Sequence, residues 1–195
     1  MANTFAPFGF RQSTGTGSAP TYEQVSVLIA STDTTACFFG DPVTPLTSGY
    51  VTRASSSSAS GNTQIAGIFV GCQYLSVAQK RTVWSNYWPG ADAVSGSVEA
   101  YIYSNPQMQF EVQSSDTTGT SAITLANIGE YIDIANAGGS TATGISGMTV
   151  DQDTLATTVT LPFIIVGLVE TPPGSDGTDR KSTRLNSSHI TISYA

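Results

Sequence analysis

Acid–base chemistry in this chain would have to come from carboxylates, and the most suggestive pair is Glu99 and Glu111. They lie on either side of a turn within residues 96–113, and each alternates with apolar residues. Two carboxylates facing each other across a strand pair could cleave a glycosidic bond. The alternation, however, assigns both side chains to the solvent side. We therefore expect polar surface residues there, and no enzyme.

A hydrolytic nucleophile would need a base, and the chain has one histidine, His189, close to its end. The two cysteines, Cys37 and Cys72, are far apart and lie outside any Cys-x-x-Cys motif. Without paired Cys or His ligands, we expect no catalytic residue, no metal site and no cofactor. We expect both cysteines to be reduced and buried, although a pairing brought about by the fold stays open.

Two short patterns are similar to ligand sites but lack their defining residues. Asp151 and Asp153 have a calcium-like spacing, yet no Gly and Glu follow to complete an EF-hand loop. We expect them to cap a turn before Leu155. Residues 138–147 are glycine-rich but lack the Gly-Lys-Ser/Thr ending of a phosphate loop. This segment is predicted to be a flexible surface loop.

Aromatic residues gather within residues 75–92, where Lys80 and Arg81 precede Trp84, Tyr87 and Trp88. A basic pair with interleaved aromatics can bind nucleic acid or sugar. Two basic residues on an acidic chain support this weakly. The preferred interpretation is an irregular loop that folds over the body or packs against a partner subunit, because Trp and Tyr are enriched in such contacts.

A second group of aromatics, Phe5, Phe8 and Phe10, lies among Ala, Pro and Gly in residues 1–21. This composition predicts an extended N-terminal arm without regular structure. The three side chains are either core residues or anchors that dock on a neighbouring subunit, and both roles stay open.

Composition places these residues on an all-β body. Only 11% of the 195 residues are charged, and short apolar runs alternate with small-residue turns. The net charge of −7 argues against nucleic acid as a partner, and the charge either keeps the chain soluble or meets a basic partner. The chain opens without the pattern of a signal peptide, and no apolar run approaches the length of a membrane span. We expect neither secretion nor a membrane.

The clearest strand signal is in residues 96–113, where period-two alternation is broken by Ser-Asn-Pro and then resumes. It predicts a hairpin with Val98, Ala100, Ile102, Phe110 and Val112 on its core face. Further strands are predicted within residues 22–30, 49–53, 64–73 and 157–169, with another short strand after a bend at residues 40–43. Together they predict a single antiparallel β-barrel or sandwich domain, residues 22–178, with an extended arm before it and long loops.

Residues 179–195 differ in character from the rest of the chain. They carry His189 and several of the basic residues, and they match the translation of a common sequencing-library adapter throughout. We interpret them as a non-native tail and leave them out of the predicted fold. On this interpretation the natural chain continues differently after about residue 178.

The body resembles a family of head decoration, or cement, proteins of tailed bacteriophages, which are virion structural proteins. The resemblance covers most of residues 5–170. It is carried by APFGFR at 6–11, FGDPV at 39–43, VTR at 51–53, IAGIFVG at 65–71, the strand pair at 101–113, TGISG at 143–147 and the apolar segment at 157–169. No catalytic signature is among these motifs. Members of the family usually continue with another strand where the adapter-like tail begins here.

The resemblance implies a non-enzymatic protein on the exterior of the capsid, made in the host cytoplasm. Its partners would be the major capsid protein and further copies of itself, since such proteins often form trimers at local three-fold positions of the lattice. The expected contacts are the arm, with Phe5, Phe8 and Phe10, and the 75–92 segment, with Trp84, Tyr87 and Trp88. The alternative is a tail- or fibre-associated module that recognises host glycan through Trp84 and Trp88.

Overall fold

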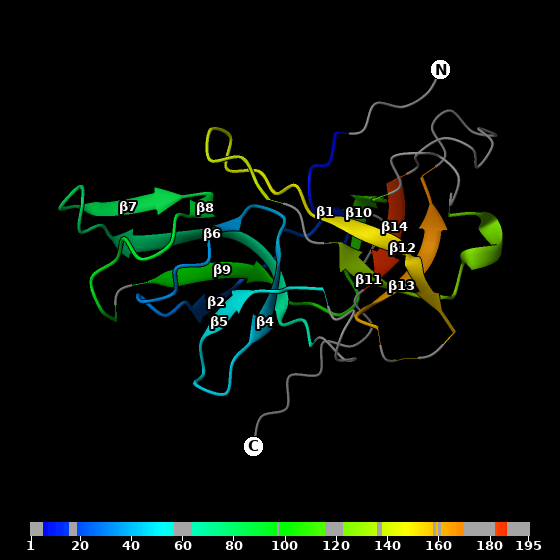
Figure 1. The fold of residues 1–195 in the computed structure, drawn as a ribbon, viewed down its shortest axis with the longest axis horizontal. Helices are drawn as coiled ribbons and strands as arrows, with labels where there is room; N and C mark the ends of the chain where they lie inside the picture. Colours follow the sequence, from blue (N-terminus) through cyan, green and yellow to red (C-terminus); the bar gives the residue numbers. More distant parts are fainter. Residues whose placement is uncertain are drawn as a thin grey trace.

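The computed structural model describes residues 6–15, 19–56, 64–96, 98–115, 123–135, 138–157, 159, 161–169 and 182–186. These residues form an all-β protein of two six-stranded sheets and one two-stranded sheet, and every strand pair is antiparallel. The two large sheets lie side by side along the longest axis of the molecule (Figure 1). The predicted fold class is confirmed.

The first sheet, sheet A, has the order β1-β10-β14-β13-β11-β12. Its strands are β1 (Arg11–Thr14), β10 (Gln109–Gln113), β14 (Ser182–Asn186), β13 (Phe163–Leu168), β11 (Tyr131–Ala135) and β12 (Thr149–Ala156). A parallel bridge joins Ser114, just after β10, to Val150 in β12, and the Ser115 N–H donates to the Val150 carbonyl at 2.8 Å. This bridge brings the far strand back toward β10, so sheet A curls around its own core.

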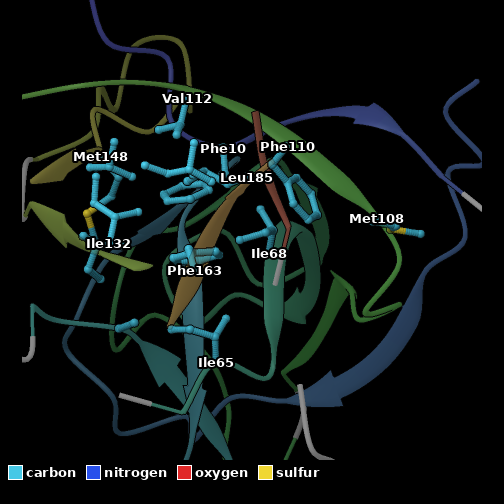
Figure 2. Close-up of a cluster of buried hydrophobic side chains, with 14 of the residues drawn as sticks. Phe10, Ile65, Ile68, Met108, Phe110, Val112, Ile132, Met148, Phe163 and Leu185 are labelled. Carbon is cyan, nitrogen blue, oxygen red and sulfur yellow. The ribbon is translucent and has the colours of Figure 1, made fainter. Parts of the chain in front are cut away.

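The core of sheet A is built from the inward side of each strand. Phe110 and Val112 are buried and alternate with half-buried Gln109 and Glu111, as period-two patterning predicts. Phe10 stacks on Phe163 with ring centroids 4.8 Å apart, and Figure 2 shows both among the other core side chains. The remaining labelled members come from several strands and loops: Ile65, Ile68, Met108, Ile132, Met148 and Leu185.

The second large sheet, sheet B, has the order β2-β9-β6-β4-β5, with β7 paired to β6 off this path. Its strands are β2 (Val25–Leu28), β9 (Glu99–Tyr103), β6 (Gly67–Leu75), β4 (Pro42–Pro45), β5 (Val51–Arg53) and β7 (Thr82–Ser85). The two-stranded sheet pairs β3 (Cys37–Phe38) with β8 (Tyr87–Trp88). One 3-10 turn, η1 (Leu125–Asn127), precedes β11.

The second core is centred on Trp88, whose side chain is fully buried. Its indole N–H donates to the Asp33 carbonyl at 3.2 Å, and its ring meets Tyr74 edge-on at 5.1 Å. Both faces of β6 are used, because Phe69 and Cys72 belong to this core while Ile68 belongs to the core of sheet A. The paired strand β9 does the same, with Ile102 in this core and Tyr103 in the core of sheet A, so two adjacent strands join the sheets.

The predicted hairpin of residues 96–113 is wrong in its pairing, although both of its strands exist. β9 pairs with β2 and β6 in sheet B, whereas β10 pairs with β1 and β14 in sheet A. The turn between them is present, since Asn105 accepts hydrogen bonds from the N–H groups of Gln107 and Met108. Each strand has both edges occupied by other strands, so the turn serves as the crossing from one sheet to the other.

The N-terminal segment is not an exposed arm over its described part, which corrects the prediction for residues 1–21. Arg11–Thr14 forms β1, and Phe10 is 1% exposed in the core. Gly9 makes this approach feasible. Its φ is +72°, and a Cβ there would lie 2.5 Å from the Cβ of Ser146. The Phe10 N–H then donates to the carbonyl of Gly40 at 2.9 Å, which ties the segment to the sheet.

Two further segments are more ordered than predicted. Residues 75–92, expected to be an irregular loop, contain β7 and β8. Residues 138–147, expected to be a flexible loop, are fastened by bridges from Ile145 to Phe39 and Ser140 and by the buried Ser146 hydroxyl, which donates to Asp41. Each segment has a partner that is distant in sequence, β3 for β8 and residues 39–41 for Ile145 and Ser146, and no local pattern records it.

The sequence analysis left residues 179–195 out of the fold, whereas the structure places Ser182–Asn186 as β14 between β10 and β13. Leu185, the apolar residue of this strand, is fully buried in the core of sheet A. A strand needs little side-chain information to fit there, because backbone groups of both neighbours supply the hydrogen bonds. The adapter origin of the tail stays a prediction.

Candidate interaction surface

Of the three N-terminal aromatics, the structure makes Phe10 a core residue. Its side chain has almost no exposed surface, so the expectation that it contacts a partner is wrong. Phe8 is half-buried, and Phe5 lies outside the described residues. The sequence left open whether these residues belong to the core or dock on a neighbouring subunit, and Phe10 belongs to the core.

The aromatics of residues 75–92 divide in the same way. Trp88 is fully buried, so it has no surface to offer a subunit or a glycan, and that expectation is also wrong. Tyr87 is half-buried and stacks on Phe38 at 5.7 Å. Trp84 is 67% exposed and is the member of the group whose side chain is available to a partner. The alternation of side chains along residues 82–88 does not show which of these aromatic residues the rest of the protein covers.

The two glutamates considered for catalysis do not face each other. Glu99 lies in sheet B and Glu111 in sheet A, and each strand is paired with other neighbours. Glu111 accepts a hydrogen bond from the Ser13 hydroxyl at 3.0 Å. Their separate positions remove the carboxylate pair that a glycosidase of this kind would use.

The remaining candidates for chemistry are structural in the described part of the chain. Cys37 and Cys72 are both free and buried, as expected, and burial raises the pKa of Cys72 to about 12. Asp151 accepts a hydrogen bond from the Asp153 N–H within β12 instead of capping a turn before Leu155. Among the described residues, no three His, Cys, Asp or Glu side chains come together as metal ligands would.

One exposed feature stands out on sheet B, and strand register defines it. Trp84 pairs with Gln73, Gln73 with Glu99, and Glu99 with Leu28, so one row crosses β7, β6, β9 and β2. Directly paired residues point to the same face of a sheet. The neighbouring row of Cys72 and Ala100 points into the buried core. The Trp84 row therefore lies on the opposite, outer face.

We call this surface the outer face of sheet B. Its members are the ladder residues of β2, β6, β7 and β9 that share the Trp84 side and are not buried: Ser26, Leu28, Gly71, Gln73, Leu75, Thr82, Trp84, Glu99 and Tyr101. Leu28 is 51% exposed, and Leu75 is 40% exposed. The strands that carry these residues lie together at one end of the molecule in Figure 1. Large apolar side chains gathered on one exposed sheet face indicate an interaction site.

At the centre of the outer face, Trp84 stacks on Tyr101 across the intervening strand β6. The ring centroids are 5.9 Å apart and the ring planes differ by 8°. The β6 residue paired with Tyr101 is Gly71, which has no side chain to come between the rings. The Tyr101 hydroxyl hydrogen-bonds the Glu99 side chain, and partial burial together with the Glu99 carboxylate raises the pKa of Tyr101. Trp84, Tyr101 and Glu99 thus form one connected group.

The end of sheet B that carries this group is held in shape by Asp92. Its carboxylate accepts hydrogen bonds from the Ser76 hydroxyl at 2.7 Å and from the Ala78 N–H at 3.0 Å. The Ser76 hydroxyl accepts in turn from the Gln79 N–H at 2.9 Å. These bonds close the turn between β6 and β7. The hairpin that carries Trp84 is therefore held in place before binding, which lowers the entropy lost when a partner binds.

The outer face can bind a partner through its aromatic, aliphatic and hydrogen-bonding groups. Its ladder residues include no acid–base pair. Sequence reasoning found Trp84 and missed Tyr101, Leu28 and Leu75 as its neighbours. The alternation of Glu99 and Tyr101 places those two on one face, but the register that adds β2, β6 and β7 is non-local.

Comparison of the chain with known protein families, curated proteins and solved structures gives no match. Across the described residues, no helix is long and apolar enough to span a membrane.

Proposed function

We propose that this protein is a non-enzymatic virion component of a tailed bacteriophage that binds the outside of the assembled head and stabilises it. Two independent lines support the proposal. The motifs spread over residues 5–170 are similar to those of head decoration proteins. The outer face of sheet B offers a braced aromatic surface of the kind that protein interfaces use.

The observation that carries the proposal is the exposure of Trp84 on top of Tyr101. A tryptophan that is 67% exposed forgoes most of the stabilisation that burial would give it, so the fold gains little from keeping it there. Trp and Tyr are the residues most often found at the energetic centre of interfaces. Their stacked arrangement on a sheet therefore supports a docking role.

Binding to a lattice explains how such a small surface could suffice. A protein that binds the assembled shell, and not the free capsid subunit, stabilises the shell by mass action. Many copies, or copies joined in a homo-oligomer such as a trimer, engage neighbouring sites together and gain avidity without additional contacts. The proposed partners are thus the major capsid protein and further copies of this chain, on the capsid exterior.

The test is cosedimentation with DNA-free heads assembled from the major capsid protein of the phage that encodes this chain. Trp84→Ala should weaken binding at least tenfold, the loss expected for an interface hot spot. Leu125→Ala is the matched control, because Leu125 is 64% exposed on η1, away from the outer face. It should bind as the unmodified protein does.

Failure of the unmodified protein to sediment with heads would contradict the proposed function. Equal binding by the Trp84→Ala and Leu125→Ala variants would contradict the role of the outer face. Deleting residues 1–20 is not a useful test, because β1 and Phe10 belong to the core and their loss would disturb folding.

The stacked pair also favours a second candidate, a tail- or fibre-associated module that binds host glycan. Sugar rings pack on flat aromatic surfaces, and Gln73 and Glu99 lie in the same row as hydrogen-bonding groups. Trp84 would act with Tyr101, because Trp88 is buried. Immunogold labelling of virions together with a glycan array separates the two candidates: label on heads without a glycan hit favours decoration.

A further inference from the structure

The outer face of sheet B has an uneven charge distribution that constrains what can cover it. Among its ladder residues, Glu99 is the one that carries a charge, and it lies near the centre of the face between Leu28 and Gln73. The rest of the face is aromatic, aliphatic or neutral polar. A partner that covers Trp84 must therefore also enclose Glu99.

Enclosing a lone carboxylate is unfavourable unless the partner compensates it. A charge that loses water without gaining a counter-charge destabilises an interface strongly. The Tyr101 hydroxyl satisfies only part of the hydrogen-bonding capacity of Glu99, because a carboxylate has about four acceptor positions. The remaining positions need donors from the partner, preferably charged ones. The net charge of −7 on the whole chain further attracts a cationic surface.

The aromatic pair beside Glu99 selects among cations. Trp84 and Glu99 lie on strands separated by β6, about 10 Å apart at the backbone. The stacking of Trp84 on Tyr101, and the hydrogen bond from Tyr101 to Glu99, bridge this gap with a continuous surface. Arginine matches such a surface, because its planar guanidinium stacks on aromatic rings and donates paired hydrogen bonds to a carboxylate. Lysine offers a compact charge without the plane.

We propose that the outer face of sheet B recognises an arginine side chain of its partner, with the guanidinium stacked on the Trp84–Tyr101 pair and hydrogen-bonded to Glu99. This inference rests on the proposed function, because it names the chemistry by which the docking surface selects its partner. The partner surface is then a basic one, in which an arginine stands among apolar side chains that meet Leu28 and Leu75.

The experiment needs no capsid, so it stays separate from the test of head binding. Hexaarginine peptide is titrated into the protein while the two tryptophan indole N–H signals are followed by NMR. Trp84 reports the outer face, whereas Trp88, buried and bonded to the Asp33 carbonyl, serves as an internal reference for an intact fold. The Trp84 signal should shift on titration and the Trp88 signal should not. Hexalysine should bind several-fold more weakly than hexaarginine.

Two glutamine variants make the test specific. Glu99→Gln should weaken hexaarginine binding at least fivefold. Glu111→Gln removes the same charge from a half-buried glutamate on sheet A, so its affinity should stay within twofold of the unmodified protein. Equal effects of the two substitutions would show that hexaarginine is attracted by the overall negative charge of the chain and not by a site at Glu99. That result would overturn the inference.

Other occupants of the face give different results, and each would overturn the inference. An unshifted Trp84 signal at saturating hexaarginine excludes a guanidinium site. A Trp84 shift produced by a neutral oligosaccharide such as cellohexaose, but not by hexaarginine, assigns the face to sugar. Concentration-dependent self-association that is lost in Trp84→Ala, without any peptide response, assigns the face to a second copy of the chain.

Discussion

At the residue scale, Gln12 in β1 is a weak point of the core. Its Nε2 and Oε1 atoms are buried and find no hydrogen-bond partner among the described residues. Gln12 pairs with Phe110, so its side chain points to the same inner face of sheet A. A buried amide without partners costs about 1–3 kcal/mol of stability.

Replacing this amide with an apolar group of similar shape should stabilise the protein. We expect Gln12→Met to raise the free energy of unfolding by about 1–2 kcal/mol, because the unpaired polar atoms are removed while the volume is kept. Urea denaturation measures the change. Gln109→Met, at a half-buried position of the adjacent strand β10, is the control and should change stability by less than about 0.5 kcal/mol. A loss of stability in Gln12→Met would show that the amide is satisfied in solution.

Asp41 is a second residue whose environment has a measurable consequence. It is fully buried, and it accepts hydrogen bonds from the Phe38 N–H at 2.8 Å and from the Ser146 hydroxyl. Burial raises the pKa of Asp41, although these hydrogen bonds and the charge of Arg53 oppose the rise. The folded state therefore binds the proton more tightly than the unfolded state does.

The sign of the pH dependence follows from that difference. The stabilisation from a raised carboxyl pKa is fully present below the unfolded pKa of about 3.9 and is lost as pH rises through the folded pKa. Asp41→Asn cannot titrate, and it also loses an acceptor, so it should be less stable throughout. We expect the stability advantage of the unmodified protein over Asp41→Asn to grow as pH falls from 7 toward 4, measured by urea denaturation at each pH. An advantage that shrinks toward low pH would mean that the pKa of Asp41 is lowered.

At the element scale, strands were predictable and their partners were not. The alternation in β9 and β10 is local information, and both strands lie where it places them. Their partners β2, β6, β1 and β14 are distant in sequence, and no local pattern records which edges meet. The same limit explains the candidate site. Trp84 and Trp88 look equivalent in sequence, and only the packing of β8 against the core separates them.

The strand β14 makes the sharpest element-scale prediction. It fills the position between β10 and β13 and contributes Leu185 to the core. Deleting residues 181–195 should lower the free energy of unfolding by at least about 2–5 kcal/mol, the cost of losing a buried leucine. It also exposes the facing edges of two strands, which promotes edge-to-edge association. Urea denaturation and size-exclusion chromatography measure both effects.

The matched control for this deletion keeps the strand. A chain lacking residues 187–195 retains β14 and should unfold at the same urea concentration as the full chain. If the two shortened chains are equally stable, β14 contributes nothing to the core of sheet A in solution.

At the scale of the whole molecule, the all-β class followed from composition and alternation, but the arrangement of two cores did not. The sequence predicted one barrel or sandwich, because every apolar face was counted toward a single interior. The structure distributes them over two cores that meet at β6, where Ile68 packs on one side and Phe69 on the other. This division also frees the outer face of sheet B, since the second core already satisfies the inner face of that sheet.

The route of the chain through the two sheets has a consequence for how the protein is made. All strands of sheet B fall between Val25 and Tyr103, whereas sheet A combines β1, near the N-terminus, with strands that begin at Gln109. During synthesis, sheet B can be complete while β1 still lacks its partner β10. At ordinary translation speeds β1 waits roughly 5–20 seconds for β10 after its own synthesis. We therefore expect sheet B to assemble first on the ribosome. Phe10 stays unburied until the later half of the chain supplies the core of sheet A.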